Sequence, residues 1–231
     1  MRLEIPIEYK KGFTKFLNCK IDLRNRVFIP RIETEFWVKK AIKELSSLKE
    51  RLKVLDIFAG SGCIGISILK NVKNSFVDFA DIDKRAIEQI KINLKLNLPH
   101  TELVLVRGKI SPKRYKIYRS NLFEKLKGKK YDFIFANPPY VAIGRLKEIQ
   151  PSVLKYEPKT SFLAGKKGLF YVRKFLKEVK KFMKPGGIIY LEIDPEQKND
   201  ILNILKKESY KNSKFFKDQF KKYRFVKVEK K

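Results

Sequence analysis

Residues 54–65 read VLDIFAGSGCIG, an apolar run that passes into a turn with three glycines. A short apolar run bounded by turn residues is typical of a buried strand, and the residues after the turn, up to Val72, have the composition of a helix. Gly60 and Gly62 allow a sharp turn and a close approach to a ligand, because a side chain there would collide with it. This order predicts one unit of a parallel α/β sheet.

Strands and helices alternate through the rest of the chain. Strands are expected at residues 53–58, 75–81, 102–106, 131–136 and 188–193, and helices at 33–50, 63–72, 83–96, 167–183 and 201–205. The tail, residues 214–229, alternates Phe, Tyr and Val with Lys and predicts an antiparallel hairpin at the sheet edge. The fold class is therefore α/β, a Rossmann-like, doubly wound and mainly parallel sheet that binds ligands at the carboxyl ends of its strands.

The first 31 residues have a different character from the rest. Residues 13–17 and 26–29 read as strands around the turn-rich segment 18–25, so a short hairpin arm is expected at 1–31. Residues 32–231 then form the α/β domain. No apolar run approaches the roughly 20 residues of a membrane span, and the N-terminus carries charges where a signal peptide is apolar. We expect a cytoplasmic protein.

Composition leaves the role of the surface open. The formal net charge is +29, and the excess is nearly all lysine. This charge fits weak association with RNA or the ribosome, and it also fits a solvated lysine surface from a genome rich in A and T. Cys19 and Cys63 have no metal-ligand spacing, so we expect free thiols and no metal.

Two acidic residues frame the glycine turn. Asp56 precedes it, where a carboxylate can face the cationic ammonium of a methionine group, and Asp81 ends the next strand, where it can accept hydrogen bonds from both ribose hydroxyls. The G-x-G-x-x-G spacing also occurs in dinucleotide sites, but these hold a pyrophosphate that Asp56 would repel. The pattern favours the sulfonium cofactor S-adenosylmethionine. A structural role for Asp56, and glycines that only permit a tight turn, remain alternatives. Asp83 is expected to cap the following helix.

Asn137-Pro138-Pro139-Tyr140 follows directly on the strand expected at 131–136, on the same rim as the glycine turn. An amide or aromatic amino nitrogen is a poor nucleophile because its lone pair is delocalised. The Asn137 side-chain oxygen and the Pro138 carbonyl can accept its two N–H groups and aim the lone pair at a methyl group. The prolines hold the backbone rigid, and Tyr140 can stack on the planar group. The motif predicts methyl transfer to a planar nitrogen.

Further stretches resemble one family, the release factor glutamine methyltransferases, which methylate the side-chain amide of the glutamine in a Gly-Gly-Gln loop. Residues 29–35, IPRIETE, are similar to the family's Pro-Arg-Pro-Glu-Thr-Glu signature, and Tyr156-Glu157-Pro158 with the glycines at 165 and 168 is similar to a later motif. Leu191-Glu192-Ile193, followed by Gln197, fits its fifth strand. The resemblance covers about residues 6–228.

The resemblance implies a class I S-adenosylmethionine-dependent enzyme that acts as a monomer on a release factor. The residues it assigns to the cofactor are Asp56, Phe58, Ala59, Gly60, Ser61, Gly62, Asp81, Asn121, Leu122 and Asn137. Asn137, Pro138, Pro139 and Tyr140 would form the catalytic loop, and Arg31 with Glu35 would shape the site. Asn121 stands where the family usually has Asp, the stretch 107–119 is longer and more basic than usual, and the family's helical N-terminal domain is expected to be absent.

Two alternatives stay open at this point. DNA or RNA methyltransferases acting on adenine N6 or guanine N2 share the Asn-Pro-Pro-Tyr loop, but they must take the base out of its stack. The arm and the stretch 107–119 are small for that task. A non-catalytic RNA- or ribosome-binding protein that keeps the fold as a scaffold is the second alternative, and the intact Gly60, Gly62, Asp81 and Asn137 argue against it.

Overall fold

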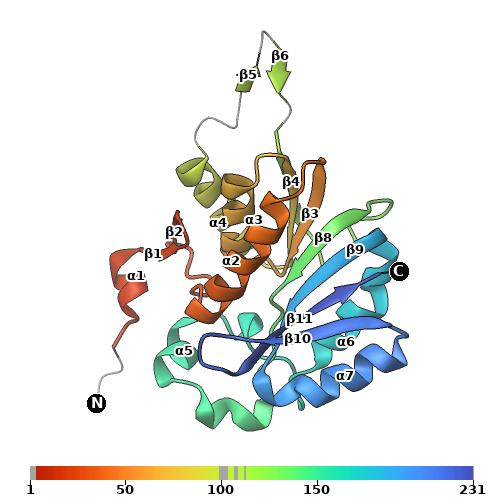
Figure 1. The fold of residues 1–231 in the computed structure, drawn as a ribbon. Helices are drawn as coiled ribbons and strands as arrows, with labels where there is room; N and C mark the ends of the chain where they lie inside the picture. Colours follow the sequence, from red (N-terminus) through yellow and green to blue (C-terminus); the bar gives the residue numbers. More distant parts are fainter. Residues whose placement is uncertain (1–3, 99–103, 107–108, 112, 231) are drawn as a thin grey trace.

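The structure is a computed structural model that describes residues 4–98, 104–106, 109–111 and 113–230 (Figure 1). Its centre is a seven-stranded sheet in the order β10-β11-β9-β8-β3-β4-β7. Five strands are parallel: β3 (Leu52–Ile57), β4 (Ser75–Asp81), β7 (Tyr115–Arg119), β8 (Tyr131–Ala136) and β9 (Met183–Glu192). β11 (Tyr223–Glu229) runs antiparallel to β9, and β10 (Asn212–Lys217) completes the C-terminal hairpin. The predicted fold class is confirmed.

Helices cover both faces of the sheet (Figure 1). One face carries α2 (Ile32–Ser46), α3 (Cys63–Asn71) and α4 (Lys84–Asn97), and the other carries α6 (Phe170–Glu178) and α7 (Lys198–Lys207). Successive side chains of a strand point to opposite faces, so Val54 belongs to the first core and Leu55 to the second. Four consecutive residues of β3, 54–57, are buried, as expected for a strand covered on both sides.

The glycine turn and its flanking elements form as predicted. β3 leads through the turn into α3, and Asp83 caps α4 by accepting from the backbone N–H of Arg85. The helix expected at 167–183 is α6 followed by a 3-10 turn, Val179–Phe182. β9 begins earlier than expected and includes Pro185-Gly186-Gly187, where its register with β8 shifts.

The third strand of the main sheet was predicted wrongly. β5 (Val104–Val106) pairs with β6 (Lys109–Ser111) in a separate hairpin that projects from the sheet (Figure 1), while residues 102–103 of the expected strand lie outside the described residues. β7 takes the third place and pairs with β4 from Val77–Tyr115 to Asp81–Arg119. β7 lies at the sheet edge, where half-burial suffices, and its strand-favouring Tyr and Ile residues stand in a short, basic stretch that was read as a connection.

The N-terminal arm also differs from the expectation. A short helix, α1 (Ile7–Lys11), precedes β1 (Phe13–Phe16) and β2 (Cys19–Asp22), and residues 26–29 are not a strand. The hairpin turns at Leu17-Asn18, with Leu17 at a φ of 51°, rather than across 18–25. Cys19 and Ile21 are buried in the core with the helices, and so are Val27 and Ile29. Backbone pairing with β1, not burial, makes residues 19–22 the second strand.

A long excursion follows the Asn137-Pro138-Pro139-Tyr140 loop and was not predicted as helical. It contains 3-10 turns at Ile143–Glu148 and Lys159–Ser161 and a short helix, α5 (Pro151–Tyr156). A bridge between Val141 and Leu163 closes its base. A last 3-10 turn, Pro195–Gln197, leads into α7. Among the described helices, none is long and apolar enough to cross a membrane.

Candidate active site

A cavity of about 550 Å³ opens at the carboxyl ends of β3, β4, β7 and β8. This is the edge at which doubly wound sheets bind ligands, and the volume suits a small-molecule cofactor. The structure brings twelve of the fifteen predicted site residues into its wall: Arg31, Phe58, Ala59, Gly60, Ser61, Asp81, Asn121, Leu122, Asn137, Pro138, Pro139 and Tyr140. Asp56, Gly62 and Glu35 are not in the wall.

The two glycines of the turn serve different purposes. Gly60 has a φ of +54°, and a Cβ there would meet no atom within 4 Å, so this backbone is open to the cavity. Gly62 has a φ of +78°, and a Cβ there would lie 3.0 Å from Ile90 and 3.2 Å from Ile66. Gly62 therefore permits the close packing of the turn against α4, while Gly60 presents backbone to a ligand.

Asp81 ties the ends of β3 and β4 together at the cavity. One carboxylate oxygen accepts from the Gly60 N–H at 2.8 Å, and the other accepts from the Asp83 N–H at 2.9 Å. Burial raises the pKa of Asp81, and these backbone donors oppose the rise. The side chain lines the cavity and keeps lone pairs for ligand hydroxyls, since a carboxylate can accept about four hydrogen bonds.

Asp56 lies behind the turn, next to the lining residue Ile57. One of its oxygens accepts from the Gly65 N–H at 2.9 Å, which anchors the first turn of α3. The other, Oδ1, is buried and has no hydrogen-bond partner among the described residues. Burial raises the pKa of Asp56 to about 8, and the nearby Asp81 carboxylate adds to the rise. A nearby cation would favour the ionised form.

Two apolar residues of the cavity wall have strained backbones. Phe58, directly after β3, has a φ of 59°, and Leu122, shortly after β7, has a φ of 50°. Residues other than glycine rarely adopt a positive φ. Such conformations cluster at functional sites, where the surrounding structure enforces them. The Phe58 ring is held edge-on against Tyr171 and Phe175 of α6, with centroid distances of 6.0 Å and 6.2 Å.

The Asn137 side chain is oriented by a buried network. Its Nδ2 donates to Thr34 Oγ1 at 3.4 Å, and that hydroxyl donates to Glu192 Oε2 at 2.7 Å. Trp37 Nε1 donates to the same carboxylate oxygen at 2.8 Å. Because the Thr34 proton is used on Glu192, the Thr34 oxygen can only accept, so the Asn137 nitrogen must face it. The Asn137 oxygen is then free to act as an acceptor in the cavity.

The rest of the catalytic loop is clamped from behind. The Tyr140 hydroxyl reaches Glu192 Oε1 at 3.5 Å, and the Tyr140 carbonyl accepts from Gln197 Nε2 at 2.8 Å. Burial and the Glu192 charge raise the pKa of Tyr140, so the phenol stays protonated. Gly168 packs so closely that a Cβ would lie 2.1 Å from the Tyr140 carbonyl oxygen. These contacts fix the loop in place. Gln197 and Gly168 themselves do not line the cavity.

The two residues predicted to shape the site, Arg31 and Glu35, take different positions. Arg31 lines the cavity, stacks over Phe28 at 4.6 Å and forms an ion pair of 2.5 Å with the buried Glu157. Burial raises the pKa of Glu157, and the Arg31 charge opposes the rise. Glu35 instead accepts from the Leu17 N–H at 2.7 Å, outside the cavity. Its contact holds the turn of the N-terminal hairpin on α2.

Sequence reasoning gave no role to four side chains that organise this site: Thr34, Glu157, Glu192 and Gln197. Glu192 is 1% exposed and Thr34 is 2% exposed. Two signals marked Glu192: the family-like stretch Leu191-Glu192-Ile193, and a charge between apolar residues, because a buried carboxylate requires donors. The hydrogen-bond partners of these four side chains lie on other helices, strands or loops, so the sequence does not reveal which residues they contact.

The residues around the cavity fit S-adenosylmethionine on three observations: the open backbone at Gly60, the carboxylate of Asp81 at the end of β4, and the unpartnered buried oxygen of Asp56. The sheet order and this site define a class I S-adenosylmethionine-dependent methyltransferase. A solved methyltransferase from Pyrococcus furiosus supports the fold, with a TM-score of 0.61 and 18% identity, covering 93% of this chain and 90% of that one.

Sequence comparisons narrow the class. Residues 38–153 match the family described as Methyltransferase small domain. The chain is 34% identical over 210 residues to a release factor glutamine methyltransferase of Clostridium acetobutylicum, covering 90% of this chain and 69% of the relative. It is 33% identical over 227 residues to that of Flavobacterium psychrophilum, covering 96% and 75%. The chain belongs to the release factor glutamine methyltransferase family.

Proposed function

We propose that this chain transfers a methyl group from S-adenosylmethionine to the side-chain amide nitrogen of the glutamine in a Gly-Gly-Gln loop of a peptide chain release factor. The observation that carries the proposal is the oriented Asn137 amide, which faces the same cavity as the glycine turn. The relatives named release factor glutamine methyltransferase support the choice of substrate.

The catalytic loop acts on the nitrogen by hydrogen bonding. When bound, S-adenosylmethionine supplies an electrophilic methyl group on a sulfonium. The Asn137 oxygen and the Pro138 carbonyl accept hydrogen bonds from the two amide N–H groups of the glutamine, so the nitrogen lone pair points to the methyl group. Both acceptors also stabilise the positive charge that develops on nitrogen during transfer. Pro138 and Pro139 have no N–H to compete for these carbonyls, and the product loses its proton readily without a strong base.

Residues on the β3 and β4 side hold the cofactor. In the proposal the Asp81 carboxylate accepts from the ribose hydroxyls, and ionised Asp56 stabilises the ammonium group across the turn. Asn121 donates to Glu124 at 3.0 Å, which leaves its side-chain oxygen to accept from the adenine amino group. An amide can therefore replace the family's usual Asp at this position. Ala59, Ser61 and Leu122 provide walls.

The arm, residues 1–31, and the α/β domain, 32–231, are proposed to act as one unit. The ion pair between Arg31 and Glu157 supports this, because it joins the end of the arm to the excursion after the catalytic loop. Arg31 then shapes the entrance for the glutamine, and Glu35 acts indirectly by holding the hairpin turn. Loss of either residue should weaken release factor binding more than cofactor binding.

A methyl-transfer assay with radiolabelled cofactor tests the proposed function. A release factor with an intact Gly-Gly-Gln loop, the same protein with the glutamine replaced by alanine, total RNA and duplex DNA are offered in parallel. We expect label on the intact release factor alone, and loss of at least about 100-fold in rate for Asn137→Ala. Label on nucleic acid and none on the release factor would overturn the substrate.

Two further expectations remain proposals: a monomer located in the cytoplasm, and weak association with RNA or the ribosome through the lysine-rich surface. The net charge of +29 supports the second. Neutralising phosphates releases counterions, so RNA binding should weaken steeply as salt rises. A gel-filtration mass tests the monomer, and an RNA-binding titration at several salt concentrations tests the association with RNA.

A further inference from the structure

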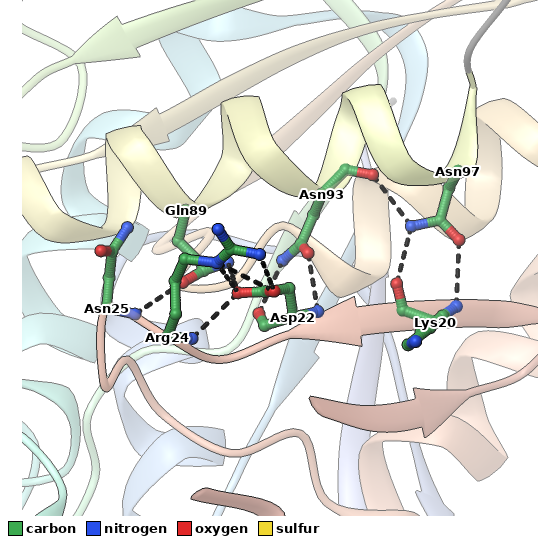
Figure 2. Close-up of polar contacts among 7 residues, drawn as sticks. All are labelled: Lys20, Asp22, Arg24, Asn25, Gln89, Asn93 and Asn97. Atoms are coloured by element: carbon green, nitrogen blue, oxygen red, sulfur yellow. Dashed lines mark hydrogen bonds and ion pairs between the residues drawn. The ribbon is translucent and has the colours of Figure 1, made fainter. Parts of the chain in front are cut away.

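The described part of α4 carries a row of three amide side chains, Gln89, Asn93 and Asn97, that faces the N-terminal hairpin (Figure 2). They stand four residues apart, on one face of the helix. Four helical residues rise about 6 Å, which nearly equals the roughly 6.8 Å spanned by two residues of a strand. Asn97 and Asn93 can therefore bind alternate residues of β2, and Gln89 reaches the segment that follows the strand.

The hydrogen bonds follow this spacing. Asn97 accepts from the Lys20 N–H at 3.0 Å and donates to the Lys20 carbonyl at 2.8 Å. Asn93 accepts from the Asp22 N–H at 2.8 Å and donates to the Asp22 carbonyl at 3.1 Å. Gln89 accepts from the Asn25 N–H at 3.0 Å. Asn97 and Asn93 thus take the place of a neighbouring strand on the edge of β2 that β1 does not pair, and Gln89 also donates to the Asp22 side chain at 3.1 Å.

Asn93 differs from the other two amides because it also binds the cofactor turn. Its Nδ2 donates a second hydrogen bond, of 2.9 Å, to the carbonyl of Ser61. An amide has two N–H donors, and here one is used on the arm and the other on the turn. Asn93 is fully buried, lies outside the cavity wall, and has no direct route to a ligand.

We propose that Asn93 is a positioning residue that couples docking of the N-terminal arm to cofactor binding. Ser61 lines the cavity in the glycine turn, and the arm supplies Phe28 and Arg31 to the wall of the same cavity. One side chain therefore fixes both the cofactor turn and the segment that leads to the substrate side. By linkage, the arm strengthens cofactor binding, and the cofactor strengthens docking of the arm by the same factor.

Calorimetric titration with S-adenosylmethionine tests the first direction of this coupling. We expect Asn93→Ala to raise the cofactor Kd about tenfold, because both the Ser61 carbonyl and β2 lose their partner. Asn97→Ala is the matched control, since it removes the equivalent pair of bonds to Lys20 and leaves Ser61 untouched. The cofactor Kd of Asn97→Ala should stay within twofold of the wild-type value. Equal effects in both variants, or an unchanged Kd in Asn93→Ala, would refute the coupling.

Hydrogen exchange tests the second direction, first in the wild-type protein and then in one variant. In the wild-type protein, saturating S-adenosylmethionine should slow exchange of the Asp22 amide several-fold, although this amide does not line the cavity. In Asn93→Asp, which keeps the acceptor for the Asp22 N–H and lacks the donors for the Asp22 and Ser61 carbonyls, that slowing should disappear. Unchanged exchange at Asp22 in the wild type would overturn the inference. Both measurements follow the cofactor alone, so failure of the release factor assignment leaves their outcome unaffected.

Discussion

Replacing Thr34 by valine removes the hydroxyl that joins Glu192 to Asn137 and keeps the shape of the side chain. Thr34 is 2% exposed, and the valine methyl fills the space of the lost hydroxyl, so no water takes its place. The Asn137 amide loses its 3.4 Å contact and can rotate away from the productive orientation. A neutral hydrogen bond of this kind contributes about 1 kcal/mol, which corresponds to about a fivefold loss in kcat.

The same substitution affects stability by a separate amount. The bond from Thr34 to Glu192 is charge-assisted and contributes about 1.5–3 kcal/mol. Trp37 still donates to the same carboxylate oxygen at 2.8 Å, so the charge keeps a donor and the lower end of the range is expected. Urea unfolding should therefore show a loss of about 1.5 kcal/mol in the free energy of unfolding.

Steady-state methyl transfer with calorimetric cofactor binding separates the two effects. We expect Thr34→Val to lower kcat about fivefold and to leave the cofactor Kd within twofold, because the glycine turn is untouched. Thr34→Ser, which keeps the hydroxyl, should restore kcat to within twofold despite its smaller side chain. Equal impairment in the serine and valine variants, or a kcat for Thr34→Val within twofold of wild type, would refute orientation of Asn137 by this network.

Three more substitutions probe the cofactor side and the catalytic loop. Asp81→Ala should raise the cofactor Kd by about 10- to 100-fold in calorimetry, because charge-assisted bonds to the ribose are lost; an unchanged Kd would exclude this role. Burial raises the pKa of Asp56 from 3.8 to about 8. Between these pH values the folded state therefore holds a proton that the unfolded state releases. The free energy of unfolding should fall as the pH rises through this interval. Affinity for the cationic cofactor should rise over the same interval, and Asp56→Asn should flatten both profiles. Gly168→Ala should destabilise the protein by about 2–4 kcal/mol in urea unfolding, since its Cβ would meet the Tyr140 carbonyl, whereas Gly128→Ala, at an equally positive φ in open space, should cost about 1 kcal/mol.

Local sequence determined the elements that carry the cofactor site. The strand predicted at 75–81 is β4 residue for residue, and Asp83 caps α4 as expected. Both depend on short-range signals, namely a buried apolar run and a side chain that accepts from a nearby backbone N–H. The catalytic loop was placed correctly on the rim because it follows directly on the buried strand β8.

The errors lie where tertiary contacts override local pattern. β7 is a short edge strand that pairing with β4 stabilises. Tyr115, Ile117 and Tyr118 favour a strand, but the basic residues of the stretch 107–119 weaken that signal. The hairpin turns at Leu17-Asn18, with no glycine or proline to mark the turn. Pairing with β1 and the bonds from α4 to Lys20 and Asp22 fix β2, and both are tertiary contacts. Glu192 reaches Thr34 across 158 residues, a pairing that no sequence spacing reveals.

The most direct test of the central claim is mass-spectrometric mapping of the methyl group on a release factor incubated with the protein and S-adenosylmethionine. We expect one added methyl on the fragment with the Gly-Gly-Gln loop, located by fragmentation on the glutamine side chain, and none with Asn137→Ala. A methyl on another side chain, or an unmodified release factor beside methylated nucleic acid, would contradict the claim that Asn137 and Pro138 bind a glutamine amide.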